Sequence, residues 1–420
     1  MLSLRRQRNL WPERNPGRFC NSPFSGTHRR QNRPINREMT ETQMNRLKGL
    51  LAHGQSVWLD NIHREMLRSG ELKKLIDVGL RGMTSNPAIF EKALSTGKAY
   101  DASLRKLFAG RKSLEEIFDV LALDDVRDAA DQFLPVHEES KGTDGFVSIE
   151  VSPLFARDTE RTLAEARRLW KLVDRPNIMV KIPATKEGLP AIQKALAEGI
   201  PVNVTLIFSV ERYHEVLEAH RRAMESRAAD GKPPAVESVA SFFVSRIDSA
   251  VDKIIQEKIQ RSKNPAEKDQ LLELLGKTAV ANAKAAYLLY KKHYGSPTWD
   301  PLKKKGARPQ RPLWASTSTK NPHYPDLMYV DTLIGVNTVN TIPPATLEAF
   351  LDHGTVADTL ESGVDKAREV LEQLKNHKID LRKVTDILEI EGVKLFVDAY
   401  DKLLAGLGAK KESMLAGAKK

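Results

Sequence analysis

The 420-residue chain has a single cysteine, Cys20, so it can form no internal disulfide, and it lacks the cysteine and histidine spacing of a zinc site. No stretch approaches the roughly 18 uninterrupted apolar residues that a membrane-spanning helix requires. Aromatic residues make up only 6%, beside 29% charged and 41% hydrophobic residues, a composition typical of soluble globular proteins. These features argue against disulfide-rich secreted proteins and integral membrane proteins, and they favour a reducing compartment such as the cytoplasm.

Acidic residues are scarce in one region only. The net charge is +11, of which residues 1–38 contribute +7, with nine arginines and two acids, Glu13 and Glu38. The remaining +4 is spread over 382 residues, which is too dilute to indicate a nucleic-acid surface. We therefore expect neither nucleic acid nor a membrane as a partner.

The arginine-rich prefix lacks helical or strand periodicity and is predicted to be disordered. It could be an organelle transit peptide, a basic arm, or an upstream extension of a protein whose working start is Met39. The last interpretation is favoured because Met39 opens a segment that reads like a helix start, whereas four prolines interrupt the prefix. We expect a prefix at 1–38, one folded domain at 39–405 and a flexible basic tail at 406–420, within a frayed segment that begins at Leu403.

Short apolar runs alternate with long amphipathic patterns from residue 55 onward, which predicts βα units with a parallel sheet. Eight such units favour a single (β/α)8 (TIM) barrel, with helical insertions after strands two and six. The predicted strands are Ser56–Asp60, Gly82–Asn86, Gly145–Val151, Ile178–Ile182, Pro201–Phe208, Ser238–Val244, Arg311–Ser316 and Val339–Ile342.

One charged residue, Lys181, stands alone in the apolar run from Ile178 to Ile182. Burial disfavours the ammonium form, so a lysine there can supply the neutral amine that a Schiff-base nucleophile needs. The alternative is a lysine at the polar end of a strand that reaches water.

Polar residues gather in or near the predicted strands, many of them towards the C-terminal end, where enzymes with this barrel place their chemistry. Each alone is more often a turn former or helix cap, but their convergence indicates a site. The residues are Asp60, Thr84, Asn86, Glu150, Lys181, Asn203, Thr205, Ser241, Arg246 and Ser316.

Two segments carry specific motifs: residues Gly82–Phe90 (GMTSNPAIF) at the second predicted strand, and residues Val180–Gly188 (VKIPATKEG) around Lys181. They resemble the strand-two motif, with Met83 where a smaller residue is usual, and the lysine segment of the transaldolase family. Members of that family are class I enzymes that move a dihydroxyacetone unit between sugar phosphates through a lysine Schiff base. The match runs from about Gln55 to Phe350 or beyond and is most similar to the longer bacterial and actinobacterial branch.

The resemblance implies roles for the residues. Lys181 is the Schiff-base nucleophile, Asp60 the base for the C4 hydroxyl, and Glu150 exchanges protons at the C2 oxygen with a water that Thr205 holds. Groups that bind the substrate are Asn86, Thr84, Asn203, Ser241, Phe243, Arg246, Ser316 and Lys320, of which Arg246, Ser316 and Lys320 are the candidates for its phosphate. Lys320 could equally be a surface charge.

The implied reaction belongs to the non-oxidative pentose phosphate pathway and needs no metal or cofactor. Sedoheptulose 7-phosphate or fructose 6-phosphate is the donor, and glyceraldehyde 3-phosphate or erythrose 4-phosphate the acceptor. A fructose-6-phosphate aldolase that releases free dihydroxyacetone is the nearest alternative, but those enzymes are shorter and carry an amide and a tyrosine where this chain has Glu150 and Phe243. A non-catalytic basic binding protein is a distant alternative. The oligomeric state, monomer or homodimer, stays open.

Overall fold

The structure is a computed structural model that describes residues 41–96 and 98–417. In these ranges eight parallel strands pair in sequence order, and the last pairs with the first to close a barrel. The strands are β1 (Gln55–Asp60), β2 (Gly82–Thr84), β3 (Phe146–Glu150), β4 (Ile178–Pro183), β5 (Val202–Ile207), β6 (Ser238–Phe243), β7 (Arg311–Ala315) and β8 (Thr338–Ile342). The predicted (β/α)8 barrel and all eight strands are confirmed, with Asn86 just beyond the end of β2.

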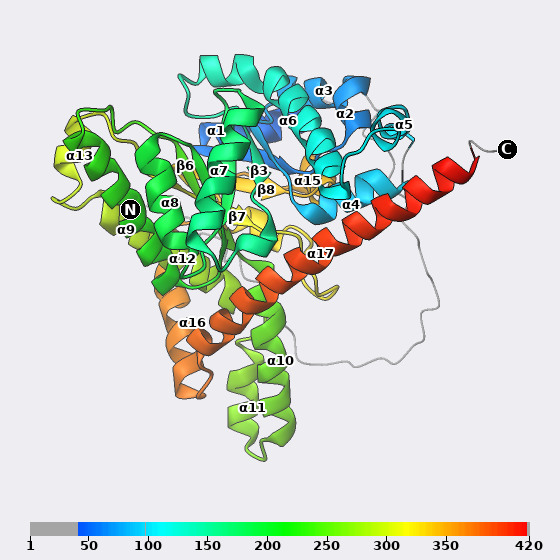
Figure 1. The fold of residues 1–420 in the computed structure, drawn as a ribbon. Helices are drawn as coiled ribbons and strands as arrows, with labels where there is room; N and C mark the ends of the chain where they lie inside the picture. The colour runs from blue at the N-terminus through cyan, green and yellow to red at the C-terminus, as the bar shows by residue number, and fades with distance from the viewer. Residues whose placement is uncertain (1–40, 97, 418–420) are drawn as a thin grey trace. The chain divides into compact units, whose positions relative to one another are not determined.

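Helices surround the barrel, and the predicted insertions follow β2 and β6 (Figure 1). Local signals explain many helix starts; the Asp158 side chain, for instance, accepts a hydrogen bond from the Arg161 N–H and caps α7. The helices are α1 (Glu41–Ala52), α2 (Arg64–Ser69), α3 (Glu71–Asp77), α4 (Pro87–Thr96), α5 (Asp101–Phe108), α6 (Leu114–Glu139), the 3₁₀ turn η1 (Pro153–Phe155), α7 (Thr159–Val173), α8 (Gly188–Glu198), α9 (Val210–Ala229), α10 (Ser245–Arg261), α11 (Pro265–Leu272), α12 (Thr278–Tyr294), α13 (Asp300–Lys304), α14 (Met328–Asp331), α15 (Pro344–His353), α16 (Val364–Asn376) and α17 (Leu381–Gly417).

The strand register sets several predicted site residues level with one another. Asp60 on β1 pairs with Thr84 on β2, and Glu150, Lys181 and Asn203 are paired in turn across β3, β4 and β5. Side chains at paired positions of parallel strands point to the same face of the sheet. The backbone therefore directs these groups into one region of the barrel.

Two non-glycine residues near the C-terminal ends of strands adopt the left-handed backbone region. Leu206 has φ of 61° at an irregularity in the pairing of β5 with β6, and Ser316, directly after β7, has φ of 56°. Such conformations cost about 1–3 kcal/mol each and cluster at functional sites, where they redirect neighbouring side chains. Thr205 and the loop that carries Lys320 adjoin these two positions.

Hydrogen-bonded polar groups close the opposite end of the barrel. Asp144 accepts hydrogen bonds from Ser56 and from the Trp58 indole (2.9 Å), and Arg311 approaches its carboxylate at 3.8 Å. Gln310 donates to Ser238 at 2.8 Å in the same layer. Since the chemistry of these barrels lies at the other end, this network serves stability.

The expected frayed segment from Leu403 was wrong for residues 403–417, which continue α17 to Gly417. Leu403 and Leu407, one helical turn apart, are buried, and the Lys410 ammonium lies 2.8 Å from the Asp101 carboxylate of α5. Packing against the barrel's other helices orders a segment whose Ala, Gly and Lys content resembles a tail. The boundary proposed at residue 405 falls inside this helix.

The predictions for the prefix concern residues that the structure does not describe. These predictions are the disorder of residues 1–38 and the choice among the three interpretations of that segment. Within residues 41–96 and 98–417, no helix combines the length and the apolar character needed to cross a membrane.

Candidate active site

Lys181 lies inside the barrel, as the sequence predicts. Only 5% of the residue is exposed, and its Nζ donates a hydrogen bond to the Ser85 carbonyl oxygen at 2.9 Å. The same Nζ lies 3.6 Å from Glu150 Oε2. The expected burial is confirmed, and the alternative in which this lysine reaches bulk water is excluded. A single amine thus faces a carboxyl group in a desolvated space.

The neighbouring carboxyl group, Glu150, is equally buried, with 7% of its side chain exposed. Its pKa is raised to about 7, because burial, with a smaller effect from the nearby Asp60, outweighs the opposing effect of Lys181. A carboxyl that titrates near neutrality can both take and give a proton during turnover. This is the property that imine chemistry requires of the group beside the amine.

Two buried oxygens of the candidate site have no hydrogen-bond partner among the described residues and mark places where substrate or water can bind. They are Glu150 Oε2 and Thr205 Oγ1. Buried polar atoms are normally satisfied, so unpaired ones at a candidate site need an explanation. A substrate hydroxyl or a water molecule would supply the missing partner.

Asp60 ends β1 and is oriented by a hydroxyl pair. Thr84 Oγ1 donates to Asp60 Oδ1 at 2.8 Å and lies 2.8 Å from Thr341 Oγ1 on β8. Desolvation raises the pKa of Asp60, against the effects of Lys181 and the Thr84 hydrogen bond. The cap of α2 is His63, so Asp60 is not a helix cap. Sequence reasoning missed Thr341, whose only signal is a hydroxyl near the end of the last strand.

Several amide and hydroxyl groups that are predicted to bind substrate form hydrogen bonds within the protein. Asn203 Nδ2 donates to Ser148 Oγ at 3.0 Å, and its Oδ1 accepts from Ser241 Oγ at 2.7 Å. Asn86 Oδ1 accepts from the Ile89 N–H at 3.0 Å, which caps the start of α4. Asn203, Ser241 and Asn86 are thereby held in fixed orientations. Ser148 is a further member that the sequence analysis did not single out.

Two cations lie on the β6 and β7 side of the site. The Arg246 guanidinium is 5.6 Å from the Phe243 ring, which packs 5.1 Å from Phe208. Burial lowers the pKa of Lys320, and the charge of Arg246 lowers it further, so the two cations lie close enough to repel each other. Paired cations of this kind are suited to a phosphate.

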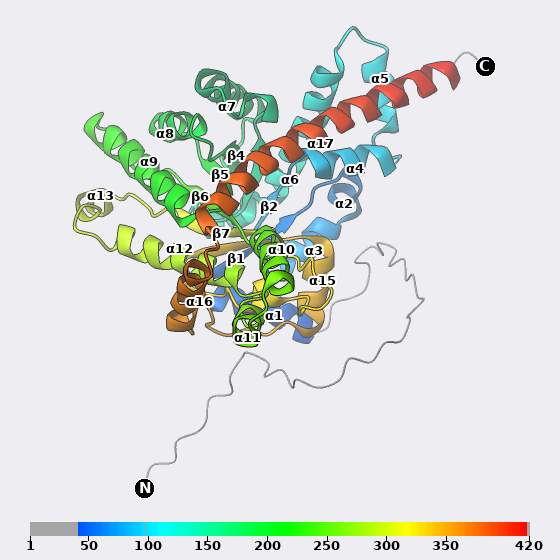
Figure 2. The ribbon, with the colours of Figure 1, turned by 90° about the horizontal axis from the view of Figure 1, so that it is seen from below.

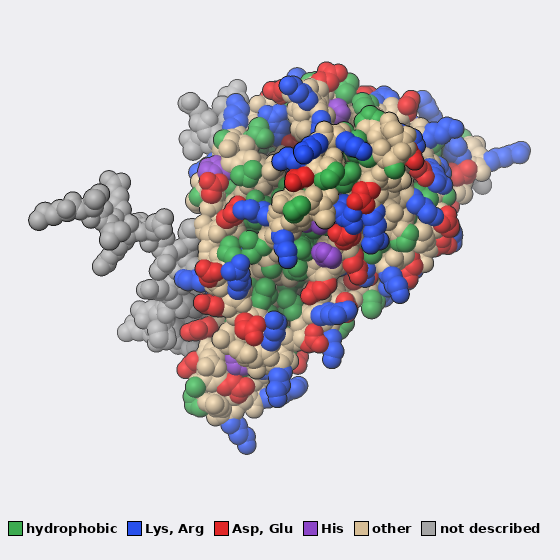
Figure 3. All heavy atoms as spheres, turned by 90° about the vertical axis from the view of Figure 1, so that its left-hand side faces the viewer, with side chains coloured by type: hydrophobic (Ala, Val, Ile, Leu, Met, Phe, Trp, Pro, Cys, Tyr) green, Lys and Arg blue, Asp and Glu red, His purple; other side chains and the backbone are tan. Residues whose placement is uncertain are grey.

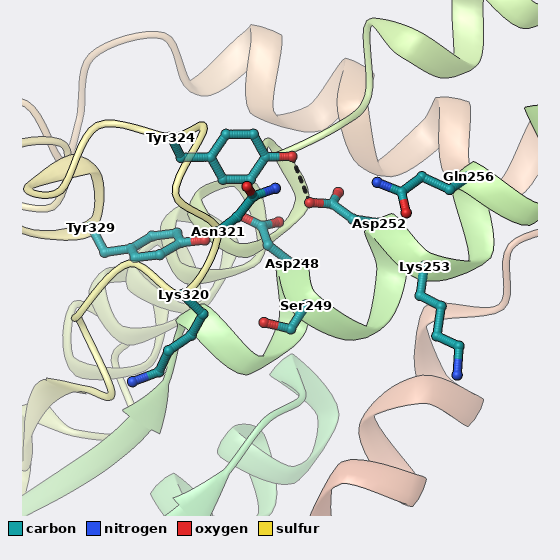
Figure 4. Close-up of a pocket in the computed structure, with 9 residues that line it drawn as sticks. All are labelled: Asp248, Ser249, Asp252, Lys253, Gln256, Lys320, Asn321, Tyr324 and Tyr329. Carbon is teal, nitrogen blue, oxygen red and sulfur yellow. Dashed lines mark hydrogen bonds between the residues drawn. The ribbon is translucent and has the colours of Figure 1, made fainter. Parts of the chain in front are cut away.

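The loop that carries Ser316 and Lys320 is tied to α10. Tyr329 Oη donates to Asp248 Oδ2 at 2.8 Å, and Tyr324 Oη donates to Asp252 Oδ2 at 2.7 Å. Figure 4 shows both tyrosines reaching towards these carboxylates, with Lys320 at the edge of the same pocket of about 230 Å³. Ser316 Oγ is 3.0 Å from Ser245 Oγ. None of the carboxylate and tyrosine partners was foreseen from the sequence.

A second cavity, of about 330 Å³, extends from the predicted site residues towards the helices. Asn86 and Glu150 lie on its wall together with Tyr400 of α17. Another residue of α17, Phe396, places its ring centroid 5.9 Å from Lys181 Nζ. Helix α17 therefore contributes to the walls of the candidate site.

The described residues offer no cluster of metal-binding side chains. No group of three or more His, Cys, Asp or Glu side chains in residues 41–96 and 98–417 is arranged to hold a metal ion. The arrangement instead offers an amine, two carboxyl groups and a set of oriented hydroxyls and amides. Such a set can form an imine and move protons around it.

Comparison with known proteins shows the family of the chain. The family model described as transaldolase/fructose-6-phosphate aldolase matches residues 57–407. A transaldolase of Thermobifida fusca (strain YX) is 50% identical over 361 residues, which cover 85% of this chain and 96% of the relative. Transaldolases of Trichodesmium erythraeum (strain IMS101) and Mycobacterium tuberculosis (strain CDC 1551 / Oshkosh) are both 48% identical, over 85% of this chain and 95% of each relative. The chain therefore belongs to the transaldolase/fructose-6-phosphate aldolase family and is an enzyme with transaldolase activity.

Proposed function

We propose that Lys181 carries this activity as the nucleophile that forms a Schiff base with a ketose phosphate. The observation that supports it is the burial of this amine at 2.9 Å from the Ser85 carbonyl and 3.6 Å from Glu150. The amine adds to C2 of the donor to give a carbinolamine, which loses water to give an iminium ion. The iminium nitrogen then withdraws the electrons of the C3–C4 bond.

Glu150 is the proton carrier of imine formation and hydrolysis. It protonates the departing C2 hydroxyl and later takes a proton from the water that attacks the imine, which fits a pKa of about 7. Thr205 holds that water, since its buried hydroxyl has no other partner among the described residues. These two residues thus serve the steps in which water leaves and returns.

Asp60 is the base that removes the proton of the C4 hydroxyl. The C3–C4 bond then breaks, the aldehyde leaves, and an enamine stays attached to Lys181. In the second half of the reaction, enamine C3 attacks the acceptor aldehyde, and Asp60 returns the proton to the new hydroxyl. Thr84 orients the carboxyl group for both transfers through its 2.8 Å hydrogen bond.

The remaining predicted residues bind the substrate. Asn86, Asn203 and Ser241 position the hydroxyls of the dihydroxyacetone unit, and Phe243 lines the space between them and the cations. Arg246, Lys320 and Ser316 bind the phosphate, because a guanidinium and an ammonium repel each other at this spot until an anion joins them.

Sugar phosphates are the proposed substrates, with sedoheptulose 7-phosphate or fructose 6-phosphate as donors. On the face drawn in Figure 3, Lys and Arg side chains are interspersed with Asp and Glu side chains, which supports small molecules over nucleic acid as partners. We propose that the enzyme acts in the cytoplasm, as a monomer or a homodimer. The single cysteine of the chain fits a reducing compartment.

Reductive trapping tests the assignment of Lys181. The protein is mixed with fructose 6-phosphate, reduced with borohydride, and weighed intact beside its Lys181→Met variant. One adduct with the mass of reduced dihydroxyacetone is expected in the unchanged chain and none in the variant, whose folding is checked by its melting curve. An unchanged adduct in the folded variant would assign the Schiff base to another residue.

A further inference from the structure

Helix α17 lies across the strand ends that carry the active site, and ion pairs hold it on two sides. Glu389 near its start lies 3.3 Å from Arg212 of α9, and Lys402 further along lies 3.1 Å from Glu91 of α4. Figure 2, which looks at this end of the barrel, shows α17 passing in front of the strands from the α16 side towards α4 and α5. The helix is therefore a fixed cover.

The first third of α17 approaches the barrel closely at a glycine. A Cβ at Gly392 would lie 3.0 Å from Leu206 Cδ2 and 3.5 Å from Phe208 Cε2, so the absence of a side chain lets the helix rest directly on β5 and the residue after it. One helical turn later, Phe396 projects to the same side of the helix. This spacing places its ring centroid 5.9 Å from the reactive amine.

An aromatic ring at that position controls the water around the amine. A water molecule needs two to four polar partners to be stable in a protein interior, and a phenyl ring edge or face is a poor partner. Glu150 and Thr205 offer partners on the strand side of Lys181, whereas Phe396 offers carbon. Water should thus be confined to the Glu150 and Thr205 side.

The position of water around Lys181 matters because the enamine on this lysine can react in two ways. It can attack an acceptor aldehyde through C3, which is transfer. Alternatively, C3 takes up a proton from a water, which leaves a hydroxide ion. A second water then adds to C2 of the resulting iminium and gives a proton to that hydroxide, and the neutral carbinolamine collapses to free dihydroxyacetone and the amine. The second route consumes one water in all and is favoured by every additional water near the enamine.

We propose that Phe396 is a specificity-determining residue that excludes water from the enamine and so favours transfer over release of free dihydroxyacetone. The inference rests on the proposed role of Lys181. It assigns a function to a helix that contributes none of the predicted site residues, and it makes the spacing of Gly392 and Phe396 part of the active site.

The test measures how the enamine is partitioned. Phe396→Ala removes the ring, Phe396→Leu keeps apolar bulk, and Leu395→Ala is the matched control, because Leu395 is the adjacent residue of the same helix and is 50% exposed. Each purified variant receives fructose 6-phosphate with and without erythrose 4-phosphate. Free dihydroxyacetone and the transfer product are quantified per donor cleaved, and melting curves verify folding.

We expect Phe396→Ala to raise the fraction released as free dihydroxyacetone by about threefold or more. Phe396→Leu should stay closer to the unchanged chain, and Leu395→Ala should match it. Equal partition in Phe396→Ala and the unchanged chain would overturn the proposal. If Phe396→Ala does not fold, Phe396→Val serves the same comparison. Borohydride trapping separates the two hypotheses. If Lys181 is not the nucleophile, the adduct persists in the Lys181→Met variant. If only the role of Phe396 is wrong, the adduct still depends on Lys181.

Discussion

Replacing Glu150 by glutamine should stabilise the fold, and only at neutral or alkaline pH. In the folded chain burial raises the pKa of Glu150 to about 7, against 4.5 for a solvated glutamate. The folded state therefore holds this proton more tightly than the unfolded state. Below about pH 4.5 both states are protonated and no penalty exists, whereas above about pH 7 folding must bury an ionised carboxylate. The penalty grows as pH rises between these limits.

The size of the effect follows from the two pKa values. Their difference corresponds to about 3 kcal/mol of unfolding free energy, and glutamine, which cannot ionise, avoids it at every pH. Urea titrations of Glu150→Gln and the unchanged chain should thus differ by about 3 kcal/mol near pH 8 and by less than about 1 kcal/mol near pH 5.

An exposed glutamate supplies the control for this comparison. Glu372 on α16 has 62% of its side chain exposed, so Glu372→Gln should change stability little and equally at both pH values. A stability difference for Glu150→Gln that is the same near pH 5 and near pH 8 would refute the reasoning, because it would show that the folded chain does not favour the protonated carboxyl group.

Three further predictions concern catalysis, the core and the loop after β7, the first with the same Glu150→Gln variant. Glu150→Gln should lower the rate constant of imine formation by about a hundredfold, measured by borohydride trapping at short times. Arg64→Met leaves the Asp125 carboxylate, now 2.7 Å from the guanidinium, without its buried cation and should lower the unfolding free energy by about 3–5 kcal/mol in urea titrations. Tyr329→Phe removes the 2.8 Å hydrogen bond to Asp248 and should raise KM for a phosphorylated donor more than it lowers kcat, since the loop that carries Lys320 loses an anchor.

The parts of the molecule that follow a local pattern were predictable from sequence. The eight strands alternate with amphipathic helices, so their order and the closed barrel follow from periodicity and a general architectural rule. The burial of Lys181 follows from its apolar neighbours on one strand. The register that sets it beside Glu150 and Asn203 follows once the barrel closes.

Residues whose roles depend on distant packing were not predictable in this way. Thr341 is one hydroxyl among many until β8 closes against β1 and brings it to 2.8 Å from Thr84. Likewise, the few large apolar residues in the Ala, Gly and Lys-rich stretch from Leu403 onward are too little to predict a helix without the surface that Leu403 and Leu407 cover. The interpretation as a tail was wrong for this reason.

Helix α17 and the strained backbone of β5 explain each other. A left-handed leucine in a strand is unfavourable by about 1–3 kcal/mol, and the surrounding packing must hold it in place. Gly392 contributes to that packing, because without a Cβ the helix can approach the Leu206 side chain closely. One helical turn later, the Phe396 ring centroid lies 5.9 Å from Lys181 Nζ. The bend that adjoins Thr205 and the helix that carries Phe396 therefore meet at one contact, between residues almost 190 positions apart in the sequence.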